Sequence, residues 1–248
     1  MFNITFKRLK SERKFNNYDV GKGIAFFTMI VDHLGFFLFP KLKVLRLIGR
    51  ASAIIYAILF GINKKRNLDK LIIYAVIFTI FDAHLNRIFP LNTLYNFYLS
   101  SFILDKLYNI YNDNFKVFFV VMSALLLLGS IANKYIEYGT FFAALMFCGR
   151  IFRKEEKTLK DKIVTVFIFF AYFCFEAYHF KFGVTYSIIL FLMFLAIYLS
   201  LFDFKFKEMG DFKFQTPFLL VSRYSTECYV IQNVILILSK YYELFLFL

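Results

Sequence analysis

Long apolar runs constrain what this chain can fold into more than any other feature. Each run approaches the roughly 20 residues that a helix needs to cross a bilayer. The runs are Val20–Phe39, Val44–Ile62, Leu71–Phe89, Leu94–Tyr111, Phe115–Ala132, Tyr135–Ile151, Ile163–Phe180, Val184–Phe202 and Pro217–Leu238. Hydrophobic residues make up 60% of the chain, which is more than the core of a soluble domain requires. We therefore expect an all-α, polytopic integral membrane helix bundle with about nine transmembrane helices.

The runs follow one another without a stretch that predicts a separate soluble domain. We expect a single membrane domain over residues 1–248, with a basic cytoplasmic tail at 1–18, the bundle at 19–238 and a short tail at 239–248. The first run is long and has no small-residue cleavage site after it, so it predicts a retained helix rather than a signal peptide. These features predict a multi-pass protein of the cell membrane.

Lysine and arginine residues predict the orientation. With nine helices and the N-terminus inside, 22 of the 30 cations fall in cytoplasmic segments and 7 in outer segments. This asymmetry follows the positive-inside rule and predicts an N-in, C-out topology. Because the cations lie in short clusters between apolar runs, the net charge of +13 points to the lipid bilayer and to no nucleic-acid partner. The fourth run, Leu94–Tyr111, is the weakest of the predicted spans.

Several ionisable residues are predicted to lie within the membrane, where they cost a few kcal/mol each and usually mark function. Asp32 and His33 lie beyond the midplane of the first predicted helix, and Arg50 lies near the outer end of the second. The others on later helices are Asp82, His84, Glu137, Glu176 and His179. In this topology all three histidines fall in the outer half of the bundle.

Several of these residues also have a structural interpretation. Asp32 either pairs with Arg50 to neutralise two buried charges or takes part in a functional site. His33 is either a core histidine with a carbonyl partner or a catalytic base. His84 and His179 lie near helix ends, where interfacial water can solvate them.

Motifs of several enzyme classes are absent from the sequence. It has no phosphate-binding P-loop, no GxGxxG, no HExxH and no GxSxG, and we expect no metal site. A histidine beside a carboxylate, with an arginine nearby, suits general-base activation of a nucleophile and binding of an anionic ligand.

Three segments near the N-terminus carry a family resemblance: YDVGKGIA at 18–25, MIVDHLG at 29–35 and LRLIGR at 45–50. They resemble the opening of the TraX family, named after the conjugation protein that acetylates the N-terminus of F pilin. The resemblance continues at Glu137-Tyr138-Gly139, where members usually carry Asp-Tyr-Gly. Tyr229-Val230-Ile231-Gln232 is similar to the family's Tyr-Pro-x-His, with Gln232 in place of its histidine. Ala53 stands where members often have proline.

The resemblance implies acetyl transfer from acetyl-CoA on the cytoplasmic side to an acceptor protein or glycan in the membrane or outside it. The family is also similar to a larger group of integral-membrane acyltransferases that place a histidine in the first helix. We therefore assign catalysis to His33 with Asp32. Substrate binding is assigned to Arg50, Asp82, Glu137, Glu176 and His179. Coenzyme A is polyanionic, so we expect its nucleotide end near Lys22, Lys64, Lys65, Arg66 or Arg150, with Arg50 holding its arm.

Two other function classes remain open. In a small-solute or proton-coupled transporter, Asp32, Asp82 and Glu176 would carry protons or cations. In a non-catalytic membrane scaffold, the buried charges would serve only the assembly of the helices. Labelled acetyl transfer and solute flux are the measurements that separate the three.

Overall fold

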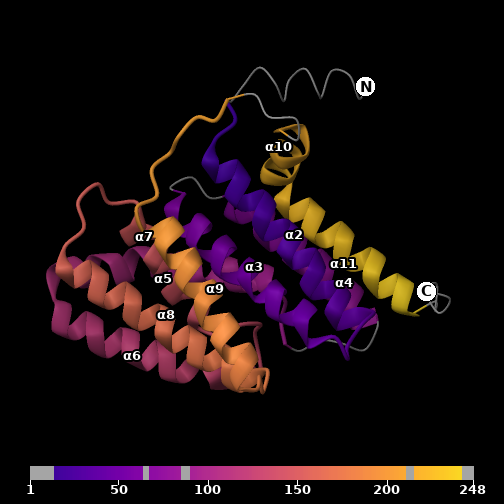
Figure 1. The fold of residues 1–248 in the computed structure, drawn as a ribbon, viewed down its shortest axis with the longest axis horizontal. Helices are drawn as coiled ribbons and strands as arrows, with labels where there is room; N and C mark the ends of the chain where they lie inside the picture. Colours follow the sequence, from indigo (N-terminus) through magenta and orange to yellow (C-terminus); the bar gives the residue numbers. More distant parts are fainter. Residues whose placement is uncertain (1–13, 64–66, 85–89, 211–214, 242–248) are drawn as a thin grey trace. The chain divides into compact units, whose positions relative to one another are not determined.

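The computed structural model describes residues 14–63, 67–84, 90–210 and 215–241, and within these residues the fold is all-α (Figure 1). The described residues form ten helices: α2 (Asn17–Phe37), α3 (Lys43–Ile62), α4 (Leu68–His84), α5 (Thr93–Asp113), α6 (Phe115–Ala132), α7 (Phe141–Phe152), α8 (Leu159–His179), α9 (Val184–Phe202), α10 (Gln215–Arg223) and α11 (Ser225–Tyr241). The all-α prediction is confirmed.

Two of the predicted spans differ from the observed helices. The span Tyr135–Ile151 is wrong at its start, because α7 begins at Phe141 and the residues before it form a turn. Gly139 takes a φ of 51° in that turn, and a Cβ there would lie 2.1 Å from the Gly129 carbonyl oxygen. The span Pro217–Leu238 is wrong as one continuous helix, because a bend at Tyr224 separates α10 from α11. The sequence has only 10 glycines and 3 prolines, so its composition gave no indication of that break.

Among the described helices, five are long and apolar enough to cross a membrane: α2, α3, α6, α8 and α9. Apolar side chains on their outer faces are exposed, such as Leu127 at 78% and Leu199 at 65%. Exposed apolar surface of this extent is typical of a membrane-facing protein. In contrast, α7 has 12 residues and extends about 18 Å, short of the roughly 30 Å of a bilayer core. The predicted number of nine spans stays a prediction.

The chain divides into two compact units. The first holds the described residues up to Tyr56 together with those from Lys205 onward, so it contains α2, most of α3, α10 and α11. The second, Ala57–Phe204, contains the end of α3 and α4 to α9. The single membrane domain predicted over 1–248 stays a prediction.

In the first unit, helix α2 begins at Asn17 because Asn16 and Asp19 form a capping box. The C-terminal helices α10 and α11 pack along α2, although they lie about two hundred residues further along the chain (Figure 1). Ser222 on α10 donates a 2.6 Å hydrogen bond to the buried Asp19 carboxylate. At Gly23, an added Cβ would lie 2.1 Å from the Phe218 ring, so this contact depends on glycine.

The second unit is built around α7, whose residues from Ala143 to Cys148 are buried. Helix α7 packs against α5, α6 and α8. It also approaches the end of α3 closely, because a Cβ at Gly149 would lie 2.1 Å from the Ile58 carbonyl oxygen and one at Gly61 would lie 2.0 Å from that of Met146. Paired small residues allow this close contact between two helix backbones.

Candidate functional site

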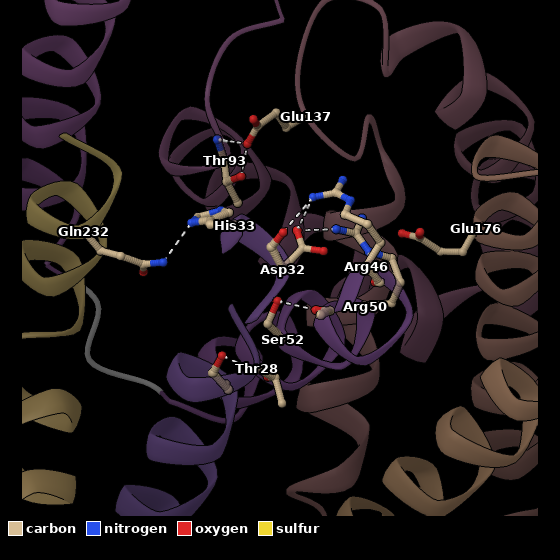
Figure 2. Close-up of polar contacts among 12 residues, drawn as sticks. Thr28, Asp32, His33, Arg46, Arg50, Ser52, Thr93, Glu137, Glu176 and Gln232 are labelled. Carbon is tan, nitrogen blue, oxygen red and sulfur yellow. Dashed lines mark hydrogen bonds and ion pairs between the residues drawn. The ribbon is translucent and has the colours of Figure 1, made fainter. Parts of the chain in front are cut away.

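Asp32 on α2 faces two arginine side chains of α3 (Figure 2). Arg46 Nη1 donates to Asp32 Oδ2 at 2.9 Å, and Arg50 Nη2 donates to the same oxygen. Asp32 is 4% exposed and Arg50 is 3% exposed. The pairing with Arg50 was one of the two predicted alternatives for Asp32, whereas the contribution of Arg46 was missed. The four-residue spacing of the arginines, which puts both on one face of α3, was the available signal.

Close packing of α2 on α3 brings the carboxylate to the arginines. A Cβ added at Gly49 would lie 2.2 Å from Asp32 Cβ and 2.3 Å from its Oδ1 atom. Near the other end of this contact, a Cβ at Gly35 would lie 2.8 Å from Leu45 Cβ. Glycine at both positions therefore permits the ion pair, as small residues do at helix contacts in membranes.

His33 follows Asp32 on α2 but points about 100° away around the helix, toward α11. Gln232 Nε2 lies 3.1 Å from His33 Nδ1 (Figure 2). The Tyr229 ring, one turn away on α11, meets the imidazole with a centroid distance of 6.1 Å and an interplanar angle of 60°. Gln232 is therefore placed to orient the His33 ring within the first unit, and the sequence indicated this residue only through the resemblance at 229–232.

Buried polar atoms without a hydrogen-bond partner among the described residues occur in the first unit. They include Asp32 Oδ1, Tyr56 Oη, Arg223 Nη2 and Gln232 Oε1. An unpartnered buried polar atom costs about 1–3 kcal/mol, so such atoms need a physical explanation. A ligand that donates to the Asp32 and Gln232 oxygens and accepts from the Arg223 guanidinium is one explanation.

The lysines and arginines assigned to coenzyme A have different surroundings. Lys22 donates a 2.9 Å hydrogen bond to the Ser222 carbonyl oxygen and lies 5.2 Å from the Tyr18 ring centroid. Arg150, in the second unit, pairs with Asp105 at 2.7 Å. The remaining three, Lys64, Lys65 and Arg66, lie outside the described residues.

Glu137 lies in the turn before α7 rather than on a helix. Its carboxylate accepts hydrogen bonds from the backbone N–H of Thr93, at 2.9 Å, and from the Thr93 hydroxyl, so it caps α5. Asn96 donates to the carbonyl oxygens of Glu137 and Gly139. The Glu-Tyr-Gly motif therefore ties a left-handed turn to the start of α5, and a substrate contact for Glu137 stays a prediction.

Two other predicted residues lie on α8. Glu176 is buried and accepts a hydrogen bond from the Tyr172 hydroxyl at 2.5 Å. His179 is exposed and stacks on the Phe175 ring, with centroids 5.5 Å apart. Asp82 and His84 belong to the last turn of α4, but their side chains lie outside the described part of the chain.

Apolar helices that bury a paired carboxylate and guanidinium, with a second guanidinium and an imidazole beside them, define a membrane protein with a polar interior site. The family model described as TraX protein matches residues 18–216. The chain therefore belongs to the TraX family. The match covers Asp32, His33 and both arginines, and it ends before Gln232.

One curated relative has a comparable sequence. An uncharacterized protein of Rickettsia prowazekii (strain Madrid E) is 30% identical over 152 residues, which are 60% of this chain and 61% of that protein. The chain thus spans about three fifths of that relative. No solved structure matches the chain.

Proposed function

We propose that this protein is an integral-membrane acetyltransferase that moves an acetyl group from acetyl-CoA to an amine or hydroxyl acceptor. The acceptor would be a protein, a pilin N-terminus included, or a glycan at the membrane. One observation carries the proposal: in a TraX-family chain, His33 lies on the first membrane-capable helix, beside a cluster in which the buried Asp32 and Arg50 pair and the half-buried Arg46 joins them. Family membership suggests the reaction class, and the cluster supplies suitable groups.

His33 is the proposed general base. An amine or hydroxyl becomes a strong nucleophile only when its proton is removed, and a neutral imidazole does this at physiological pH. Acetyl-CoA supplies an acyl carbon bonded to a thiolate leaving group. His33 takes the proton of the acceptor as the new C–N or C–O bond forms, and it returns that proton to the sulfur as the acyl C–S bond breaks and coenzyme A leaves as its thiol. This acyl transfer requires neither an oxidant nor a metal.

Asp32 has a positioning role in this proposal. Its Oδ2 atom holds Arg46 and Arg50 in place, and the guanidinium groups favour the negative charge that develops on the acyl oxygen. Asp32 Oδ1 and Tyr56 Oη have no partner among the described residues, and the amide N–H and carbonyl groups of a pantetheine arm match their hydrogen-bonding capacity. These atoms support the fit of the donor in the first unit.

We further propose nine spans in the cell membrane, with the N-terminus in the cytoplasm. Helix α2 then runs outward, and Asp32 lies about 22 Å along it, beyond the midplane. A reporter that is active only in the cytoplasm, fused at the C-terminus, should be silent. An active reporter would require an even number of spans.

A second candidate is a transporter, and the bend at Tyr224 between α10 and α11 favours it. Interrupted membrane helices are typical of the binding sites of secondary transporters. The buried charge cluster suits a carrier as well as an enzyme. Acetyl transfer remains the preferred function because the family resemblance names that chemistry.

The deciding experiment uses purified full-length protein in liposomes with radiolabelled acetyl-CoA and membrane extract. Label that appears on a protein or glycan acceptor supports the transferase. Solute flux without label transfer would contradict it and support the transporter. Inactivity in both assays, from folded protein, would favour a scaffold.

A further inference from the structure

The side-chain amide of Gln232 faces the imidazole of His33 from a different helix. The two residues are 199 positions apart, and Gln232 Nε2 lies 3.1 Å from His33 Nδ1 (Figure 2). The other end of the same amide, Oε1, is buried and has no hydrogen-bond partner among the described residues. A half-turn of the amide exchanges its donor and acceptor ends with almost no change of shape. The contact therefore has two chemical forms.

The two forms give His33 opposite tautomers. If the amino group faces Nδ1, the ring accepts there and carries its proton on Nε2, so no free lone pair remains. If the carbonyl faces the ring, Nδ1 carries the proton and donates it to Gln232, and the lone pair of Nε2 is free. Only the second form leaves His33 able to accept a proton from an acceptor.

The other described neighbours of His33 in the first unit are less suited to orient its ring. The Oδ2 atom of Asp32 already accepts from both arginines, and Asp32 lies on a different face of α2 from His33. Phe37 and Tyr229 meet the imidazole with ring centroids 6.3 and 6.1 Å away. An amide also adds no charge, whereas an unpaired carboxylate in an apolar interior costs several kcal/mol. Gln232 is thus chemically suited to orient a neutral imidazole.

We infer that Gln232 is a positioning residue whose carbonyl oxygen accepts from His33 Nδ1–H and keeps Nε2 as the free base. Its amino group then points away from the ring. The inference rests on the proposed function of His33 as a general base. It assigns a defined chemical role to the position where the resemblance places a histidine in other family members.

The tautomer can be measured directly, without an activity assay. Full-length protein containing ¹⁵N-labelled histidine is studied by NMR in detergent, at a pH where the ring is neutral. The signals of His33 are those that disappear in His33→Asn. We expect a protonated Nδ1 in the wild type and a shift of the proton toward Nε2 in Gln232→Met. A wild-type ring protonated on Nε2 would overturn the inference, whatever the enzyme does.

Kinetics provide the second test. Gln232→Met should lower kcat at least about tenfold with little change in KM for acetyl-CoA, because the lost partner orients the base rather than binding the donor. Gln232→Glu should retain kcat within about threefold, because its carboxylate can still accept from Nδ1–H. The matched control is Asn233→Leu, since the Asn233 amide donates to its own helix, at the Tyr229 carbonyl oxygen, and to no other described residue.

The outcomes separate this inference from the proposed function. An unchanged kcat in folded Gln232→Met would overturn the positioning role. Undiminished acetyl transfer by the His33→Ala variant would contradict the proposed role of His33 as general base. The NMR measurement would still decide whether Gln232 sets the tautomer of the His33 ring.

Discussion

Asp32 and Asp161 are both buried carboxylates paired with cations, but their surroundings differ. Both oxygens of Asp161, in the second unit, are fully bonded: Oδ1 accepts from Tyr111 and Lys154, and Oδ2 accepts from the backbone N–H and hydroxyl of Thr158. In the first unit, both guanidinium groups bond Asp32 Oδ2, and Oδ1 has no partner among the described residues. A carboxylate with both oxygens hydrogen-bonded stabilises the structure, whereas one with an unpartnered oxygen can still accept a hydrogen bond from a ligand.

The same contrast applies to the two histidines whose side chains are described. His33 lies inside the first unit against a polar amide, and His179 is exposed at the end of α8 and stacks on an aromatic ring. A base that works on a bound acceptor needs a fixed orientation and a dry environment. The comparison therefore favours the first unit for the proposed chemistry, and the predictions below test that assignment.

The largest expected effect comes from His33→Ala. Turnover should fall about 10²- to 10⁴-fold, the usual range for loss of a general base, while the protein stays folded and membrane-inserted. His179→Ala is the matched variant in the second unit and should reduce turnover much less. Acetyl transfer by purified protein measures both. If His179→Ala inactivates and His33→Ala does not, the site belongs with Glu176 and His179.

Replacing each aspartate by asparagine should separate function from stability. Asp161→Asn should destabilise the protein by about 2–4 kcal/mol, because bonded donors lose a charged acceptor, while the folded fraction stays active. Asp32→Asn should reduce both activity and yield, because it leaves two arginines without their carboxylate. Thermal unfolding in detergent and specific activity per folded protein are the measurements. Equal losses of specific activity in the two variants would contradict the comparison.

Glycine substitutions test the helix contacts behind the two units. Gly49→Ala would place a methyl group 2.2 Å from Asp32 Cβ, and Gly149→Ala would place one 2.1 Å from the Ile58 carbonyl oxygen. Each should cost about 1–3 kcal/mol of stability, and Gly49→Ala should in addition lower specific activity by moving Asp32. Gly183→Ala has no atom within 4 Å of its new methyl group and serves as the neutral control.

The smallest effect is expected at Arg150. Its guanidinium is already paired with Asp105, so Arg150→Gln should raise the KM for acetyl-CoA by no more than about fivefold. Asp105→Asn, which releases Arg150, is the paired control. An unchanged KM in both variants would remove Arg150 from the predicted donor contacts.

Hydrophobic pattern alone predicted most of the helices, because a run of about 20 apolar residues has few other stable states. It failed where backbone geometry decides the outcome. The turn at Tyr138 and Gly139 delays α7 to Phe141, and the bend at Tyr224 divides the last predicted span. An average over a window of about 20 residues hides both breaks, although polar residues mark them: Lys134 and Glu137 precede Gly139, and Arg223 and Ser225 flank Tyr224.

By itself, the sequence determined the fold class, the family and the candidate residues Asp32, His33 and Arg50, because charged groups inside apolar runs are rare and expensive. Tertiary structure alone decided which groups meet. It brought Arg46 onto Asp32 through the glycine contact of α2 with α3, and it brought Gln232 to His33 from 199 residues away. Such partners depend on how helices pack, and the period of one helix carries no information about the face of another.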